Sequence, residues 1–409
     1  VDRHVFAKRL RVWVNADGFI SQLDIKALEN FEPGPEPHWQ FIAPAGDGRS
    51  VVIHLVARMP VGENTVRFQF TRPNRAGVEP RLGRPLPLDC RVCLTVRLDI
   101  EDRGFHGETL RNPGSEAHFT NATHRLHAGV GFSFTPAPER HLRVESDAGV
   151  FHQAAEWSMA IPHPIEASRG MVAAADAWSP GWFEIPMPPG STATLTATAE
   201  RGGEPQEGEP GTGRPGKDSE DPVVGPLLRA ARAFVVARGG ARTVIAGYPW
   251  FLDWGRDSLI AARGLLAGGM ESEVRSLLEV FARFEDRGTL PNAIHGENAS
   301  NRETSDAPLW FGMLCEEWAG HVQRRDIYDH RISPGGRTVA DVLRSIACGY
   351  LAGTPNGTKV DASSGLVWSP GHFTWMDTNH PAGTPREGYP AEIQALWIRL
   401  LRQLAEQIG

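Results

Sequence analysis

The feature that most constrains the fold of this chain is a break in composition at residues 201–222. The break contains Gly, Pro and charged or polar residues and almost no apolar side chain, so it cannot contribute to a packed core. Before the break, short apolar runs alternate with turn residues. After it, apolar residues recur with the period of a helix. The sequence therefore predicts a β domain over 1–200, a flexible linker over 201–222 and a helical domain over 223–409.

Several short segments in the first 200 residues are typical of β-strands. Segments 51–57 and 90–98 are rich in apolar and β-branched residues, and segment 192–198 alternates threonine with apolar residues. Turn residues, such as the Pro-Pro-Gly at 188–190, lie between such runs. Many short strands with little helical periodicity predict an N-terminal β-sandwich.

Six later segments have a helical period of about 3.6 residues, namely 223–238, 257–268, 271–285, 305–323, 337–352 and 389–408. The loops between them are long at alternate junctions, and the loop over 353–388 is the longest. A loop of this length in a compact domain is usually functional. Successive helices with this loop pattern predict a layered helical toroid that follows the β-sandwich.

Composition and charge argue against several kinds of partner. The net charge is −7 and no Lys/Arg run stands out, so we do not expect nucleic acid or an anionic membrane to bind. No apolar run approaches the roughly 20 residues that a membrane-spanning helix needs. Four cysteines in 409 residues fit a reducing compartment, so we predict a cytoplasmic location.

Cys90 and Cys93 have the Cys-x-x-Cys spacing of a zinc site, but no second pair of ligands is evident. If the segment is a strand, the two thiols point to opposite faces and cannot hold one ion. We therefore predict no metal site.

Residues 247–257, Gly-Tyr-Pro-Trp-Phe-Leu-Asp-Trp-Gly-Arg-Asp, combine four aromatic rings, two carboxylates and one guanidinium. Aromatic rings stack on sugar faces, while Asp and Arg form paired hydrogen bonds with hydroxyls. The segment therefore predicts a sugar site lined by Trp250, Asp253, Trp254, Arg256 and Asp257. The alternative is an N-cap with a surface salt bridge at a helix start, where the helix dipole also favours the Asp257 carboxylate.

Asp306 lies in the segment Glu303-Thr-Ser-Asp-Ala-Pro-Leu-Trp-Phe311. A structural interpretation makes Ser305 or Asp306 a helix cap. The functional interpretation places the Asp306 carboxyl at the mouth of the toroid beside Trp310. An apolar neighbour would raise the pKa of that carboxyl, as a general acid requires.

The long loop over 353–388 carries Trp375 and Asp377, and Asp377 has no evident structural role there. Arg386 and Glu392 follow, near the start of the last helical segment. These two side chains could form a structural ion pair or take part in the sugar site.

Four separated segments, in this order, resemble the amylo-α-1,6-glucosidase module of glycogen debranching enzymes. They are residues 247–257, Ser305-Asp-Ala-Pro-Leu-Trp-Phe311, Thr374-Trp-Met-Asp377 and Pro390-Ala-Glu-Ile-Gln-Ala-Leu-Trp397. The strong part of the resemblance covers roughly 225–409. The N-terminal part is similar to the β-sandwich of that family through shorter pieces, such as Asp176-Ala-Trp-Ser-Pro-Gly-Trp-Phe183.

The resemblance implies an (α/α)6 barrel that binds a branched α-glucan and hydrolyses α-1,6-linked glucose stubs with inversion, without a cofactor. Such hydrolysis uses two carboxyls roughly 6.5–9.5 Å apart. Asp306 matches the position of the general acid, and Arg256 with Asp257 matches the pair that holds the terminal glucose. The pocket would also be lined by Asp253, Trp254, Trp375, Asp377, Arg386 and Glu392.

A complete barrel of this kind has twelve helices, whereas the sequence predicts about six before Gly409. We therefore expect a partial (α/α)6 toroid. The general base would lie beyond Gly409, with Asp377 as the best substitute within the chain. The 409-residue piece alone would then be inactive.

Two other functions stay open. An alkaline invertase of the same superfamily carries a similar Glu-Ile-Gln-Ala-Leu segment, and its product from sucrose would be glucose plus fructose. A non-catalytic glucan-binding protein would bind the glucan without turnover.

Overall fold

The computed structural model describes residues 4–60, 63–74, 83–105, 107–168, 170–200, 221–247, 251–323, 326–333, 336–378 and 383–408. These residues form two compact units, one within 3–214 and the other within 215–409. Most of the predicted linker, 201–220, lies outside the described residues. None of the described helices combines the length and the apolar character that a membrane span requires.

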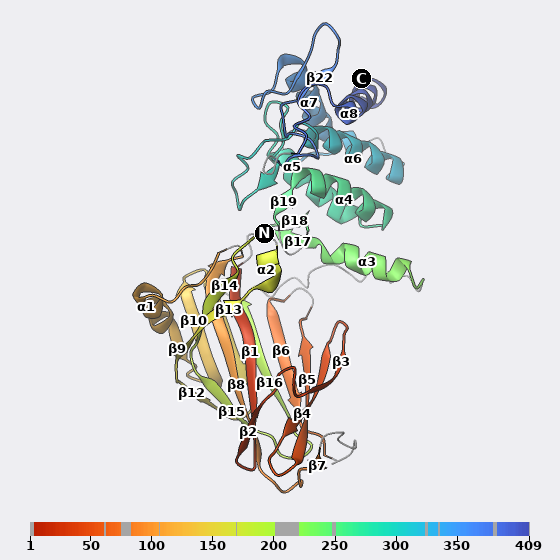
Figure 1. Ribbon diagram of the computed structural model, residues 1–409. Helices are drawn as coiled ribbons and strands as arrows, with labels where there is room; N and C mark the ends of the chain where they lie inside the picture. Colours follow the sequence, from red (N-terminus) through yellow and green to blue (C-terminus); the bar gives the residue numbers. More distant parts are fainter. Residues whose placement is uncertain are drawn as a thin grey trace. The chain divides into compact units, whose positions relative to one another are not determined.

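The first unit consists of two mainly antiparallel sheets (Figure 1). Among the described residues one sheet has seven strands: β1 (His4–Ala16), β2 (Phe19–Gln22), β8 (Val92–Gly104), β12 (Val150–His152), β13 (Glu156–Pro162), β14 (Ala174–Ser179) and β15 (Trp182–Pro186). The other has nine: β3 (Leu28–Glu32), β4 (His38–Pro44), β5 (Arg49–Arg58), β6 (Thr65–Thr71), β7 (Arg84–Pro85), β9 (Thr123–Arg125), β10 (Val130–Ala137), β11 (Arg140–Ser146) and β16 (Thr192–Glu200). Two short helices, α1 (Pro113–Ala122) and α2 (Pro164–Ser168), complete the unit.

A single hydrophobic core fills the space between the two sheets. Val14 on β1 and Leu94 on β8 are buried against Ile53 on β5 and Phe70 on β6. This sharing of one core by two sheets follows from the alternation of side chains along each strand. The predicted strands 51–57 and 192–198 lie within β5 and β16. The predicted strand 90–98 begins later, at Val92, so Cys90 precedes it.

The second unit is mainly helical. Its helices are α3 (Val224–Ala233), α4 (Gly255–Ala267), α5 (Glu271–Arg283), α6 (Ala307–Val322), the 3₁₀ helix η1 (Asp326–Asp329), α7 (Val339–Ala352), α8 (Ala391–Gln403) and the π-helical turn η2 (Leu404–Ile408). Three short strand pairs accompany them: β17 (Val235–Arg238) with β18 (Ala241–Val244), β19 (Asp253–Trp254) with β20 (Ala293–Ile294), and β21 (Lys359–Val360) with β22 (Val367–Trp368). The architecture of sheets followed by helices is thus confirmed.

The predicted helix 223–238 is wrong at its end. The helix stops at Ala233, and 235–238 forms strand β17 instead. The β-branched Val235 and Val236 favour an extended backbone, and they pair with Val244 and Thr243 of β18.

Alternate helices of the second unit lie side by side, because α4 packs on α6 and α6 packs on α8 (Figure 1). Ion pairs join the middles of these helices: Arg263 of α4 with Glu317 of α6, at 2.7 Å, and Arg399 of α8 with Glu316 of α6. Arg256 at the start of α4 also pairs with Asp306 at the start of α6, so α4 and α6 run parallel.

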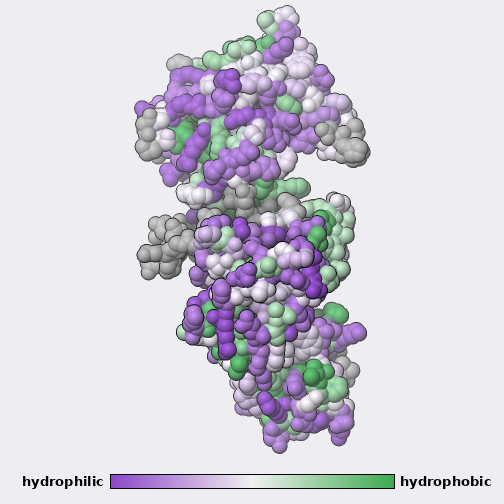
Figure 2. Space-filling view, turned by 90° about the vertical axis from the view of Figure 1, so that its left-hand side faces the viewer, coloured by the Kyte–Doolittle hydropathy of each residue, from purple (hydrophilic) through white to green (hydrophobic). Residues whose placement is uncertain are grey.

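Hydrophilic residues predominate on the face of the molecule shown in Figure 2, where hydrophobic residues occur in small groups.

A close backbone approach fixes the start of α4. The Gly255 N–H donates to the Asn292 carbonyl at 2.8 Å, and a Cβ at Gly255 would lie 2.4 Å from the Pro291 carbonyl oxygen. Only glycine fits there without moving the helix start, which carries Arg256.

We expect Gly255→Ala to lower the free energy of unfolding by about 1–3 kcal/mol, because the added methyl group overpacks the contact. Gly264 lies on the same helix with nothing within 4 Å of its Cβ position, so Gly264→Ala should raise it by about 0.5–1 kcal/mol. Urea unfolding of the two variants measures both effects. Equal changes of the same sign would contradict the role of the close approach.

Candidate active site

The side chain of Arg256 joins three distant segments of the second unit. Its Nε and Nη2 donate to the two carboxylate oxygens of Asp306, at 2.6 and 3.0 Å. Its Nη1 donates to Asp377 Oδ2 at 3.1 Å, and its Nη2 also donates to the Thr374 carbonyl at 2.7 Å. The structure therefore brings together three predicted site residues that are up to 121 positions apart.

Asp306 occupies the N-cap position of α6, but its side chain does not cap the helix. Thr304 takes that role, because its hydroxyl oxygen accepts from the Ala307 N–H at 3.3 Å. The Thr304 hydroxyl in turn donates to Asp306 Oδ1 at 2.7 Å. The interpretation of Asp306 as a side-chain cap is therefore wrong, and its carboxylate is used to hold Arg256.

The loop that carries Asp377 is fixed to the start of α6 through Ser305. The Ser305 N–H donates to the Phe373 carbonyl at 2.8 Å, and its Oγ lies 2.6 Å from Ser369 Oγ. The Tyr350 hydroxyl donates to the Ser305 carbonyl at 2.7 Å. The sequence analysis did not assign these anchors, although Ser305 lies in the same segment as Asp306.

Asp257 follows Arg256 in the first turn of α4, and its side chain is exposed. Partial desolvation by neighbouring protein groups is the main cause of its raised pKa. Asp377 and Asp306 also raise the pKa of Asp257 by repulsion, while Arg256 lowers it. Asp257 therefore shares the electrostatic environment of the Arg256 cluster.

Asp253 lies elsewhere, in β19, where it is fully buried. Its Oδ2 is 2.8 Å from Nε of Arg238. Burial raises the pKa of Asp253 to about 6, against the opposing effect of Arg238. The structure thus pairs Asp253 with Arg238 and not with the Arg256 cluster. Asp253 would have to break this pair in order to contact a sugar.

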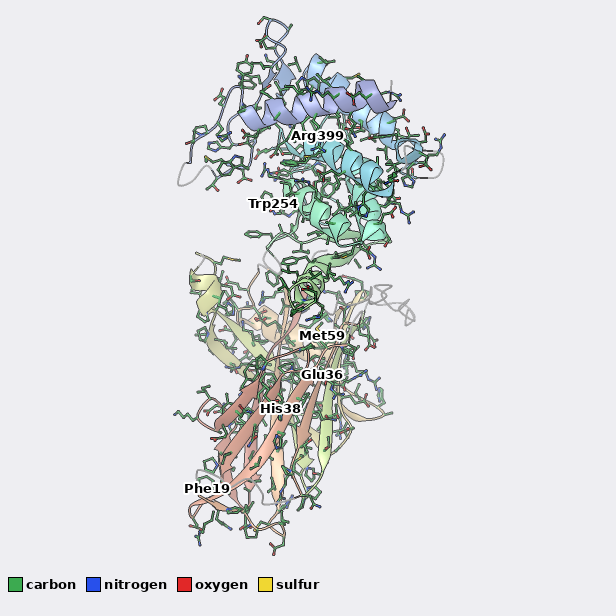
Figure 3. All side chains as sticks on the ribbon, turned by 90° about the vertical axis from the view of Figure 1, so that its right-hand side faces the viewer. Phe19, Glu36, His38, Met59, Trp254 and Arg399 are labelled. Atoms are coloured by element: carbon green, nitrogen blue, oxygen red, sulfur yellow. The ribbon has the colours of Figure 1, made fainter. Side chains whose placement is uncertain are left out.

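The predicted aromatic residues take different environments. Trp254 is half-buried at the start of α4 (Figure 3). Trp375 is 58% exposed, and the Arg386 guanidinium lies 5.7 Å from its ring centre. Trp310 is half-buried, with Arg263 5.9 Å from its ring centre. Trp250 lies outside the described residues.

Arg386 also pairs with Glu392, so the ion pair considered for these two residues is present. The backbone of Arg386 has φ = 53°, in the left-handed region. Non-glycine residues adopt this conformation at a cost, and such residues occur often at functional sites.

The buried Asp253 gives a pH-dependent prediction. Its pKa is raised from 3.8 to about 6 on folding, so its contribution to stability is fully present below about pH 4 and is lost as the pH rises through 6. The unfolding free energy of the wild type, relative to Asp253→Asn, should therefore fall by up to about 3 kcal/mol between pH 4 and pH 7. Denaturant unfolding at both pH values measures it. Asp286→Asn, at a half-exposed carboxylate, is the control. If the difference in unfolding free energy between the wild type and Asp253→Asn did not change with pH, the raised pKa of Asp253 would be contradicted.

Comparisons with solved structures give low similarity. A bacterial glucoamylase complexed with acarbose shares 11% identity at a TM-score of 0.43, over 87% of this chain and 54% of that one. A putative kojibiose phosphorylase from human microbiome shares 8% identity at a TM-score of 0.43, over 97% of this chain and 55% of that one. This chain thus spans about half the length of these two proteins. The comparison with curated proteins gives no match.

Two protein families match this chain, one in each structural unit. Residues 3–194 match the family described as glycogen debranching enzyme N terminal. Residues 229–408 match the family described as amylo-alpha-1,6-glucosidase. The two matches follow one another in the order of the two structural units and cover most of the sequence. The chain therefore belongs to the glycogen debranching enzyme family, with an N-terminal domain and an amylo-alpha-1,6-glucosidase domain.

Proposed function

We propose that the helical unit is the glucosidase part of a debranching enzyme, which removes α-1,6-linked glucose stubs from a branched α-glucan by inverting hydrolysis. The observation that carries this proposal is the convergence of Arg256, Asp306 and Asp377 on one point, in a domain of the amylo-alpha-1,6-glucosidase family. The four cysteines are free thiols, which supports the proposed cytoplasmic location.

In the proposed fold, α4, α6 and α8 belong to the inner ring of an (α/α)6 toroid, with α5 and α7 in the outer ring. The side-by-side packing of alternate helices supports this assignment. The starts of the inner helices would then meet at one rim, where the loops with Asp306 and Asp377 also lie.

We propose that Arg256 and Asp257 hold the hydroxyls of the terminal glucose. The four hydrogen bonds described above use four of the five guanidinium N–H groups of Arg256. One N–H on Nη1 is left to donate to a sugar hydroxyl, and the adjacent exposed Asp257 can accept from another. Trp375 would offer its exposed ring to the glucan.

Asp377 is the better candidate for the general acid, although the resemblance points to Asp306. The Asp306 side chain is 3% exposed, and its oxygens accept from Arg256 and Thr304, so a glycosidic oxygen cannot reach it readily. The Asp377 side chain is 32% exposed, and the Arg256 bond uses only its Oδ2. Proton transfer requires direct contact with the leaving oxygen, which favours Asp377. Asp306 would then be the residue that positions Arg256.

Asp306 and Asp377 do not form the inverting acid–base pair by themselves. The Arg256 guanidinium occupies the space between them, whereas an inverting pair needs room for a sugar and a water molecule. The proposed reaction therefore requires a further carboxylate as general base.

We expect Asp377→Asn in the full-length protein to lower kcat/KM on limit dextrin by about 10²–10⁴-fold. The loss on α-glucosyl fluoride should be much smaller, because fluoride leaves without a proton. Asp306→Asn should impair both substrates, because Arg256 loses its charged partner. Initial rates on the two substrates measure this, and the reverse pattern would assign the acid role to Asp306.

Glucose release from glycogen limit dextrin, with the β-anomer formed first, tests the reaction itself. Glucose plus fructose from sucrose would instead identify an invertase. Binding of limit dextrin without turnover by the full-length protein would identify a non-catalytic glucan-binding protein.

A further inference from the structure

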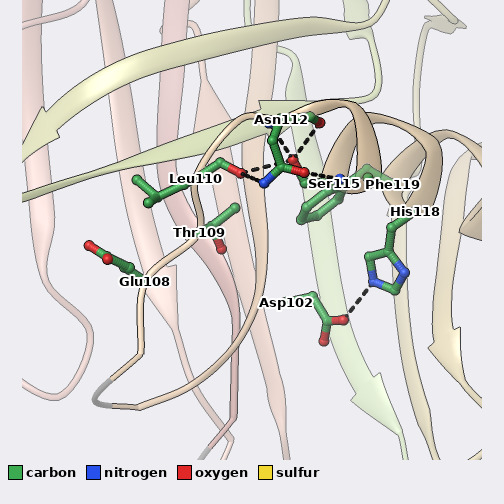
Figure 4. A pocket seen from close by; sticks show the side chains of 9 residues that line it. Asp102, Glu108, Thr109, Leu110, Asn112, Ser115, His118 and Phe119 are labelled. Atoms are coloured by element: carbon green, nitrogen blue, oxygen red, sulfur yellow. Dashed lines mark hydrogen bonds and ion pairs between the residues drawn. The ribbon is translucent and has the colours of Figure 1, made fainter.

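The first unit contains a polar pocket that the proposed glucosidase reaction does not use. Its volume is about 480 Å³, and it lies where the end of β8 meets the loop before α1 and the start of that helix. Its polar lining comes from Asp102, Glu108, Thr109, Asn112, Ser115 and His118 (Figure 4). A volume of this size suits one or two sugar rings.

The part of the loop next to α1 is held in place by two sets of hydrogen bonds. Asp176 of β14 donates its N–H to the Thr109 carbonyl and accepts from the Arg111 N–H with Oδ2, both at 2.8 Å. Asn112 and Ser115 form a capping box at the start of α1. The pocket is therefore preformed, which reduces the entropy lost on binding.

The Asp102 carboxylate is also fixed in one orientation. Its Oδ1 lies 2.6 Å from Nε2 of His4. Its Oδ2 lies 2.8 Å from Nε2 of His118 (Figure 4). Arg140 Nε is 3.5 Å from Oδ1. Three nitrogen groups thus surround the carboxylate, so its orientation is already set before a ligand binds.

Thr109 supplies an independent sign of a ligand. Its residue is 5% exposed, and its hydroxyl has no hydrogen-bond partner among the described residues. A buried hydroxyl without a partner costs about 1–3 kcal/mol, so each such group needs an explanation. Thr109 lines the same pocket as Asp102 and His118 (Figure 4).

The chemistry of the lining favours a neutral polyhydroxyl ligand. Two carboxylates, Asp102 and Glu108, disfavour an anion, and Glu116 already occupies the first turn of α1. A metal ion is not favoured either, because no group of three or more ligating side chains among the described residues is arranged to hold one. Carboxylates that accept and hydroxyls that both donate and accept are well matched to the vicinal hydroxyls of a sugar.

We propose that this pocket is a second carbohydrate site, which holds a glucose unit of an α-glucan on the β unit. The choice of glucose rests on the proposed function of the helical unit, whereas the choice of a sugar rests on the pocket alone. Its role would be to hold the branched substrate while a stub is removed.

The test follows the methyl signals of Leu110, which also lines the pocket, in leucine-labelled full-length chain during titration with maltose. We expect a saturable shift. Thr109→Val and the exposed Glu108→Gln should each weaken maltose binding about fivefold or more, as expected for one lost hydrogen bond. Thr123→Val is the matched control, because Thr123 is also buried with no described hydroxyl partner, but it does not line the pocket. It should leave the affinity unchanged.

Three results would overturn the proposal: no saturable shift with maltose, maltose affinity in both pocket variants equal to that of the wild type, or tighter binding of inorganic phosphate than of maltose at Leu110. The readout is independent of the helical unit. Maltose binding at Leu110 without glucose release from limit dextrin would reject the proposed function and keep the pocket. Glucose release from limit dextrin with no effect of maltose on Leu110 would keep the proposed function and reject the second carbohydrate site.

Discussion

The buried ion pair between Arg256 and Asp306 is the contact on which the candidate site depends. It joins the start of α4 to the start of α6, and the remaining Arg256 donors hold the loop at Thr374 and Asp377. A buried ion pair contributes little net stability, because desolvation offsets most of the attraction. Its consequence here is geometric, since one planar guanidinium sets the relative positions of three chain segments.

Much of the fold can be predicted from the period of apolar residues. The change from alternation to a helical repeat correctly separated the sheets from the helices. The prediction failed where a short β-branched stretch followed a helix, at Val235 and Val236. There the hairpin with Val244 outweighs the continuation of the helical pattern, and such long-range pairing is not visible in a local window.

The candidate site shows a different limit. The types of residue in the sequence pointed to Arg256, Asp306 and Asp377, but not to their pairing, because spacing along the chain does not report which side chains meet. Asp253 illustrates this, since it lies three residues before Arg256 and yet pairs with Arg238. In the β unit, Asp102 meets His4 from 98 residues away, and no local pattern marks that contact.

The balance of charge around Arg256 bears on the proposed chemistry. One guanidinium lies near three carboxyls, those of Asp257, Asp306 and Asp377. Desolvation is the main cause of the raised pKa of Asp257, and repulsion from Asp377 and Asp306 adds to it. A surplus of negative charge is unfavourable in the resting site but becomes favourable when positive charge develops nearby. Glycoside hydrolysis passes through an oxocarbenium-like transition state. Fixed carboxylates at the rim would therefore stabilise that state more than the neutral substrate, which is the condition for electrostatic catalysis.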